Sequence, residues 1–188
     1  MVSLPRIKFE KRSCWASALA ALLILSVAWP AAGQRPDAKN FVTHLDGGEQ
    51  VPPNATQATG QAIFHLNEDG TELSYKLIVA NIYNVVASHI HLSVTGVNGP
   101  VVAFLAGPFA PGGGRVDGVL AVGTITAANL VGPLAGMDFS VLVAAMRAGG
   151  TYVNVHTNDG VDPTNTGPGD FPGGEIRGQI RGAGPPAE

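Results

Sequence analysis

Three separated segments of the chain alternate between polar and apolar side chains. They cover residues 88–92, 151–157 and 174–181. Alternation with a period of two predicts β-strands that have one polar and one apolar face. The apolar members, which would face a core, are Ile90, Leu92, Val153, Val155, Ile176 and Ile180. The pattern therefore predicts a sheet with a hydrophobic core on one side and polar side chains on the other.

Other segments predict further strands, separated by glycine and proline residues that mark turns. The predicted strands cover residues 41–45, 60–66, 73–79, 88–94, 101–105, 118–126, 151–157 and 174–180. One segment differs, because apolar residues recur at helical spacing from Phe139 to Met146, between Asp138 and Gly149. We therefore predict an all-β fold, an antiparallel Greek-key-like β-sandwich with one short amphipathic helix.

The N-terminus has the pattern of a secretory signal peptide. Basic residues precede an uncharged apolar stretch at residues 15–29, and Ala31 and Gly33 supply small residues for cleavage before Gln34. The stretch is shorter than the roughly 20 residues of a spanning helix. We expect residues 1–33 to be removed, which leaves a secreted protein, extracellular or periplasmic, without a membrane span. The alternative is an uncleaved N-terminal anchor.

The rest of the chain is expected to form one domain. A short linker would cover residues 34–40, the domain residues 41–182 and a flexible tail residues 183–188. The only cysteine, Cys14, precedes the apolar stretch, so the domain contains no disulfide and depends on packing and sheet hydrogen bonds. The formal net charge of the chain is −3, and no basic patch is visible in the domain. We therefore expect no binding of nucleic acid.

Short motifs recur in a fixed order along the domain. They occupy residues 45–53, 58–60, 88–91, 96–102, 152–157 and 174–180. In this order and number they resemble the CHRD domain, a module named for its repeats in chordin and also found singly in bacterial secreted proteins. The resemblance implies an all-β domain of about this length. It implies little about activity, because the family has no well-established catalytic reaction.

The polar faces of the alternating segments contain a candidate metal site. His89 and His91 lie two residues apart on one predicted strand and His156 lies on another, so three neutral imidazoles could ligate one ion. Glu175 is a possible fourth ligand, or could orient an imidazole. Imidazole ligand sets suit zinc or copper, which are the possible cofactors.

A structural role is the alternative for the same polar face. The histidines would then be hydrogen-bonded under a loop to Tyr152, Asn154, Thr157 or backbone groups. Arg177 would have a structural role too, for instance by binding a carboxylate on a loop, and an exposed ion pair with Glu175 would contribute only about 0–1 kcal/mol.

Three functions remain open from the sequence. The favoured one is a non-catalytic binding or structural module that holds a protein or a glycan, because no complete catalytic motif is present. The second is a metal-binding protein centred on His89, His91 and His156. The third is a metal-dependent enzyme, for instance one that acts on reactive oxygen species, which also needs an open coordination position.

Overall fold

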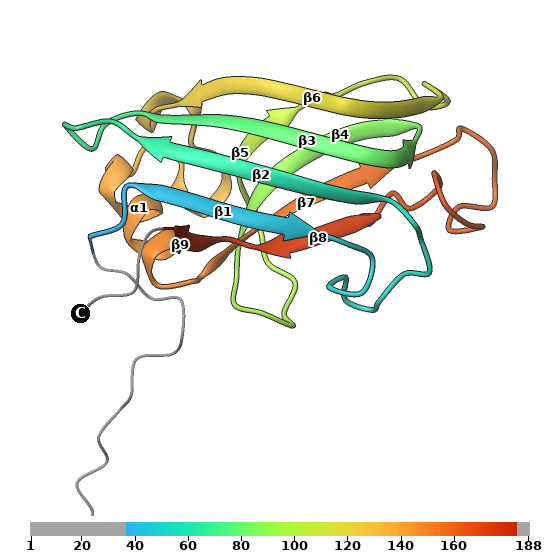
Figure 1. Cartoon of the computed structure of the whole chain (residues 1–188), viewed down its shortest axis with the longest axis horizontal. Coiled ribbons are helices and arrows are strands. Elements are labelled where there is room, and N and C mark those ends of the chain that lie inside the picture. Colours follow the sequence, from blue (N-terminus) through green and yellow to red (C-terminus); the bar gives the residue numbers. More distant parts are fainter. Residues whose placement is uncertain (1–36, 184–188) are drawn as a thin grey trace, which may run out of the picture.

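The computed structural model describes residues 37–183. The predicted signal peptide, residues 34–36 of the predicted linker and residues 184–188 of the predicted tail lie outside this range. Within it, two antiparallel sheets face each other as a sandwich, and a short helix lies at one end (Figure 1). The predicted all-β sandwich with one short α-helix is therefore confirmed.

The strands are divided between a five-stranded and a four-stranded sheet. In spatial order, the five-stranded sheet contains β6 (Arg115–Ile125), β3 (Leu73–Tyr83), β2 (Thr59–Leu66), β1 (Asn40–Leu45) and β9 (Arg181–Ala183). The four-stranded sheet contains β5 (Val101–Ala106), β4 (Val85–Leu92), β7 (Thr151–Thr157) and β8 (Ile176–Gln179). Between β6 and β7 the chain forms two 3-10 turns, η1 (Ala127–Asn129) and η2 (Gly132–Leu134), and the helix α1 (Phe139–Arg147).

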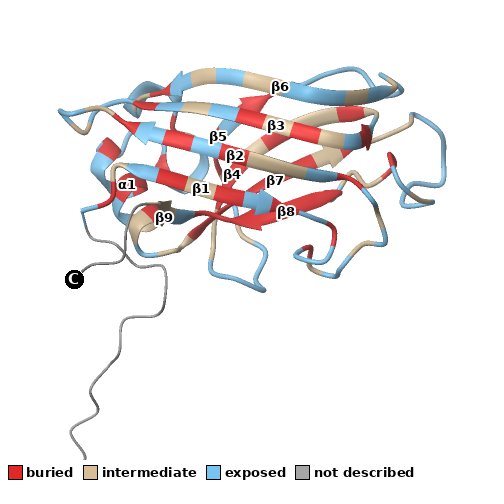
Figure 2. Ribbon diagram, in the orientation of Figure 1, coloured by how far each residue is buried: buried red, intermediate tan, exposed pale blue. Residues whose placement is uncertain are grey.

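The hydrophobic core lies between the two sheets. Phe41, Phe64 and Leu77 from the five-stranded sheet are completely buried, as are Ile90 and Val153 from the four-stranded sheet. Figure 2 shows buried and exposed residues alternating along β1, β2 and β3. Because alternate side chains of a strand point to opposite faces, this pattern places one face of each strand in the core.

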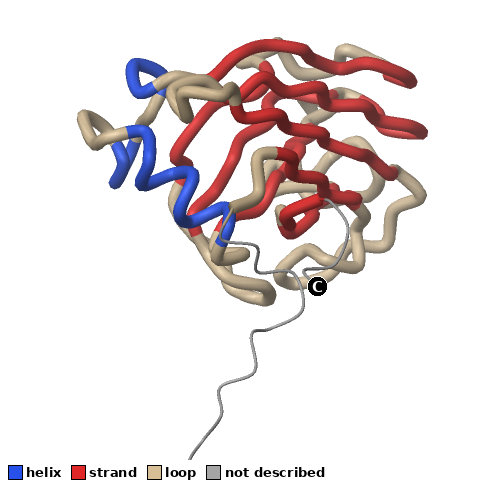
Figure 3. Tube along the Cα trace, turned by 60° about the vertical axis from the view of Figure 1, so that its left-hand side comes forward, coloured by secondary structure: helices blue, strands red, loops and turns tan. Residues whose placement is uncertain are grey.

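The helix α1 packs at the end of the sandwich (Figure 3). The carboxylate of Asp138 accepts a hydrogen bond from the backbone N–H of Ser140 (2.8 Å) and so caps its first turn. The side chains that it buries are Phe139, Leu142, Val143 and Met146. These are the residues whose spacing predicted the helix. No helix within residues 37–183 is long and apolar enough to cross a membrane.

The last alternating segment, residues 174–181, is divided between two strands in the structure. β8 pairs with β7, whereas β9 pairs with β1 in the other sheet. The chain changes sheet at Ile180, which is completely buried. The alternation of residues 174–181 predicts one polar row of Glu175, Arg177, Gln179 and Arg181, but Arg181 lies in the other sheet. The prediction of one polar row was wrong here, because alternation does not show which sheet a residue joins.

β8 also lies directly against β1 and closes one edge of the sandwich. The backbones of Asp46 and Arg177 exchange two hydrogen bonds of 3.0 Å. A Cβ atom at Gly178 would lie 1.9 Å from the carbonyl oxygen of His44. Only glycine therefore allows the two backbones to approach this closely.

We expect Gly178→Ala to destabilise the domain by about 1–3 kcal/mol or more, because the added methyl group overlaps a backbone carbonyl. Urea unfolding of both proteins measures the difference. Gly173→Ala is the matched control, since a Cβ atom there would meet no atom within 4 Å. Equal stabilities of the two variants would contradict the close packing of β8 on β1.

Candidate functional site

The face of the four-stranded sheet that points away from the core is polar, and loops cover it. Tyr152, Asn154 and Arg177 on this face are only 1%, 3% and 1% exposed. Hydrogen bonds join the face to residues 50–54, 94–99 and 172–173. Loops therefore cover most of this polar face.

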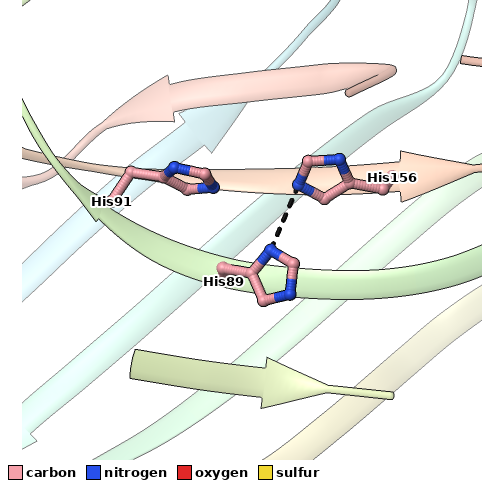
Figure 4. A group of neighbouring side chains, drawn as sticks. All are labelled: His89, His91 and His156. Carbon is pink, nitrogen blue, oxygen red and sulfur yellow. Dashed lines mark hydrogen bonds between the residues drawn. The ribbon is translucent and has the colours of Figure 1, made fainter. Parts of the chain in front are cut away.

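His89 and His91 from β4 and His156 from β7 come together on this face (Figure 4). Since His89 pairs with Asn154 across the two strands, His156 lies diagonally opposite His89. One nitrogen atom of each ring lies within 4.8 Å of those of the other two, and Nδ1 of His89 is 3.2 Å from Nε2 of His156. Tetrahedral zinc places its ligand nitrogens about 3.3 Å apart, so small side-chain movements would bring all three into coordination.

Backbone carbonyls hold two of the three imidazoles. Nδ1 of His91 lies 2.9 Å from the carbonyl oxygen of Gly99, and Nδ1 of His156 lies 2.8 Å from that of Pro172. A carbonyl oxygen can only accept a hydrogen bond, so each neutral ring has its proton on Nδ1 and a lone pair on Nε2. Nε2 of His91 is buried and has no hydrogen-bond partner in the described part of the chain.

Burial lowers the pKa of all three histidines. The pKa of His89 falls to about 4, first because of desolvation and then because of repulsion by His156 and His91. Desolvation also lowers the pKa of His91 and of His156, although the hydrogen bonds to Gly99 and Pro172 oppose the effect. The cluster is therefore neutral at pH 7, which is the form of imidazole that binds a metal ion.

Tyr152 supports His91 from one side. The two rings are stacked, with centroids 4.8 Å apart and an angle of 11° between their planes. The phenol oxygen of Tyr152 accepts a hydrogen bond from the N–H of Gly99 (3.1 Å), while the carbonyl of Gly99 binds His91. Side chains of the site thus hold both backbone polar groups of Gly99.

Arg177 lies on the same side, and its guanidinium carbon is 3.5 Å from the centroid of the Tyr152 ring. The guanidinium donates hydrogen bonds to the side-chain oxygen of Asn98 (3.1 Å) and to the carbonyls of Val97 (3.0 Å) and Val94 (3.3 Å). It forms no ion pair with any acidic group in residues 37–183. Arg177 therefore clamps a loop, as expected, but through neutral oxygens rather than through a carboxylate.

Glu175 lies outside the group of three histidines. Its buried carboxylate accepts hydrogen bonds from the hydroxyl of Thr56 (2.6 Å), the hydroxyl of Thr157 (2.7 Å) and the N–H of Gly169 (2.8 Å). With these bonds Glu175 connects β7 to two loops. In the structure it is a buried hydrogen-bond acceptor and does not converge with the imidazoles.

Three contributors to the site were not predicted from the sequence. The carbonyls of Gly99 and Pro172 are backbone groups, and a backbone group leaves no signature in residue type. Phe104 of β5 packs edge-on against His89, with centroids 4.7 Å apart, while half of its own side chain stays exposed. Phe104 and His89 are paired in the register of β5 on β4. Only that register could have indicated the contact between the two rings.

A family model of the CHRD domain matches residues 41–180. The chain belongs to the CHRD domain family. The matched CHRD domain begins in β1, ends directly after β8 and contains His89, His91 and His156. No curated protein and no solved structure matches the chain.

We expect the domain without added metal to lose stability as the pH falls from 6.5 toward 4. In the unfolded chain His89 has its ordinary pKa of about 6.5, whereas in the folded domain its pKa is about 4, so acid favours the unfolded state. The contribution is fully present above the unfolded pKa. Urea unfolding midpoints at pH 7 and pH 5 measure the loss. A His89→Asn variant should lose less, and an equal loss in both proteins would contradict the lowered pKa.

Proposed function

We propose that this CHRD domain binds one transition-metal ion, zinc or copper, through His89, His91 and His156. The supporting observation is the arrangement of lone pairs, because carbonyl groups fix the protons of His91 and His156 on Nδ1 and leave a lone pair on each Nε2. In the structure without metal, Nε2 of His156 contacts Nδ1 of His89 (3.2 Å), and an ion bound to both nitrogens would replace this contact. Nε2 of His91 is buried without a hydrogen-bond partner among the described residues, which is an unfavourable state for a polar atom. A metal ion would supply the missing interaction.

The surroundings of the imidazoles also favour a metal ion. Metal-binding histidines usually donate their other ring N–H to a carboxylate or a backbone carbonyl, which fixes the tautomer and the orientation of the ring. His91 and His156 have this arrangement before any ion is bound. Three imidazoles leave a fourth position that water or an external ligand would occupy. Zinc and copper both accept such a ligand set.

We further propose that the domain acts outside the cytoplasm. The signal-peptide pattern of residues 1–33 supports export. Membership of the CHRD family is consistent with it, because CHRD domains occur in extracellular and periplasmic proteins. In that compartment the site would take up its metal ion after export and folding.

We expect the purified domain, prepared without a histidine tag, to bind one zinc or copper ion per chain and to melt at a higher temperature when the ion is added. An ion that binds only the folded state, present at 100 times its dissociation constant, stabilises by about 2.7 kcal/mol. His91→Ala should remove both effects, because it deletes the nitrogen that lacks a partner. Calorimetric titration with zinc chloride and with copper chloride measures the binding.

The two other histidines of the chain provide matched controls. His44 and His65 are exposed and lie on the five-stranded sheet. His44→Ala and His65→Ala should each bind the ion as the parent does. The proposal fails if the parent binds neither ion, or if His91→Ala remains folded by circular dichroism and binds as well as the parent.

A further inference from the structure

The structure contains a cleft of about 610 Å³. The segments that line it lie at the end of the sandwich opposite α1 (Figure 1). Its walls come from the loop before β2, the end of β3, the start of β6 and the loop that precedes β8. The lining residues are Ala55, Thr56, Gln57, Asn81, Tyr83, Arg115 and Pro168. The volume falls within the range of about 300–1,000 Å³ that small-molecule sites occupy.

The cleft combines one aromatic ring with several uncharged polar groups. The side chain of Tyr83 is 40% exposed, and the guanidinium carbon of Arg115 lies 5.9 Å from its ring centroid. Thr56, Gln57 and Asn81 add a hydroxyl group and two amide groups. A ligand that lies on the Tyr83 ring is therefore within reach of donors and acceptors on several sides.

The charge in the cleft is balanced. Nε of Arg115 donates to a carboxylate oxygen of Asp117 (2.6 Å), and Nη2 of Arg115 donates to the side-chain oxygen of Asn81 (2.9 Å). Asp117 also accepts the backbone N–H of Asn81 (2.7 Å). Because the guanidinium is already paired with a carboxylate, the cleft favours a neutral ligand over an anion.

A buried carboxylate holds the walls in place. Glu175 binds the hydroxyl of Thr56 and the N–H of Gly169, which follows Pro168 in the chain. Nδ2 of Asn54 donates to the carbonyls of Gly174 and Glu175, at 2.7 and 3.2 Å. The loop before β2 and the loop that precedes β8 are thus fixed before a ligand arrives, so binding requires little ordering of these two loops.

We propose that this cleft binds a neutral saccharide. A sugar ring has an apolar face of C–H groups, which packs on an aromatic ring, and a rim of hydroxyl groups, each of which both donates and accepts hydrogen bonds. Tyr83 provides the platform, and the amides of Gln57 and Asn81 with the guanidinium of Arg115 bind the hydroxyl groups. The inference is independent of the metal site, because the two share no side chain.

The test is a titration of the ¹⁵N-labelled protein, observed through its backbone amide signals. The probes are the tetrasaccharides of glucose, mannose, galactose and N-acetylglucosamine at millimolar concentrations. We expect saturable shifts at residues 55–57, 81–83 and 115 with at least one of them. Tyr83→Ala should weaken the affinity about tenfold or more, since the ring supplies the main apolar contact.

Two further variants and one charged saccharide serve as controls for this titration. Phe109→Ala removes an aromatic side chain that is 48% exposed but does not line the cleft, and it should bind as the parent does. Gln57→Ala, at an exposed position, should also weaken binding and replaces the tyrosine variant if that one unfolds. Saturable shifts with none of the tetrasaccharides, or only with an acidic galacturonate tetramer, would overturn the proposal.

Discussion

The buried guanidinium of Arg177 is the interaction on which the covered polar face depends. A buried charge is costly unless its donors are satisfied, and here three oxygen atoms of residues 94–98 and the face of Tyr152 surround it. These contacts fix the loop, and the loop places the carbonyl of Gly99 where it binds His91. The orientation of a candidate metal ligand is therefore set by a charged side chain that does not itself touch the histidine nitrogens.

Glu175 and Arg177 show how a short segment organises two separate sites. They are two residues apart, but their charged groups form no ion pair within the part of the chain that the structure describes. Each binds loop groups instead, so that Arg177 supports the histidine cluster and Glu175 holds the walls of the cleft beside Tyr83. Hydrogen bonds to fixed loops explain why both charges stay buried.

Periodicity predicted the parts of the structure that depend on local pattern. The strand at residues 151–157 and the helix near Asp138 have the predicted positions, because alternation and capping are encoded in neighbouring residues. Alternation placed His89, His91 and His156 on the polar faces of their strands. They share one face because β4 and β7 are neighbours, which alternation alone does not show. The covering loops and the change of sheet at Ile180 depend on contacts between residues far apart in the chain, which a single sequence does not reveal.

The central claim is that backbone carbonyls fix the tautomers of His91 and His156. Long-range ¹H–¹⁵N correlation spectra of the imidazole rings at pH 7, recorded without metal, test it most directly. The account predicts a protonated Nδ1 and an unprotonated Nε2 in both rings, whereas exposed His44 reports the tautomer mixture of a free imidazole. A proton on Nε2 of either ring would contradict the account, because its lone pair would then point away from the proposed metal ion.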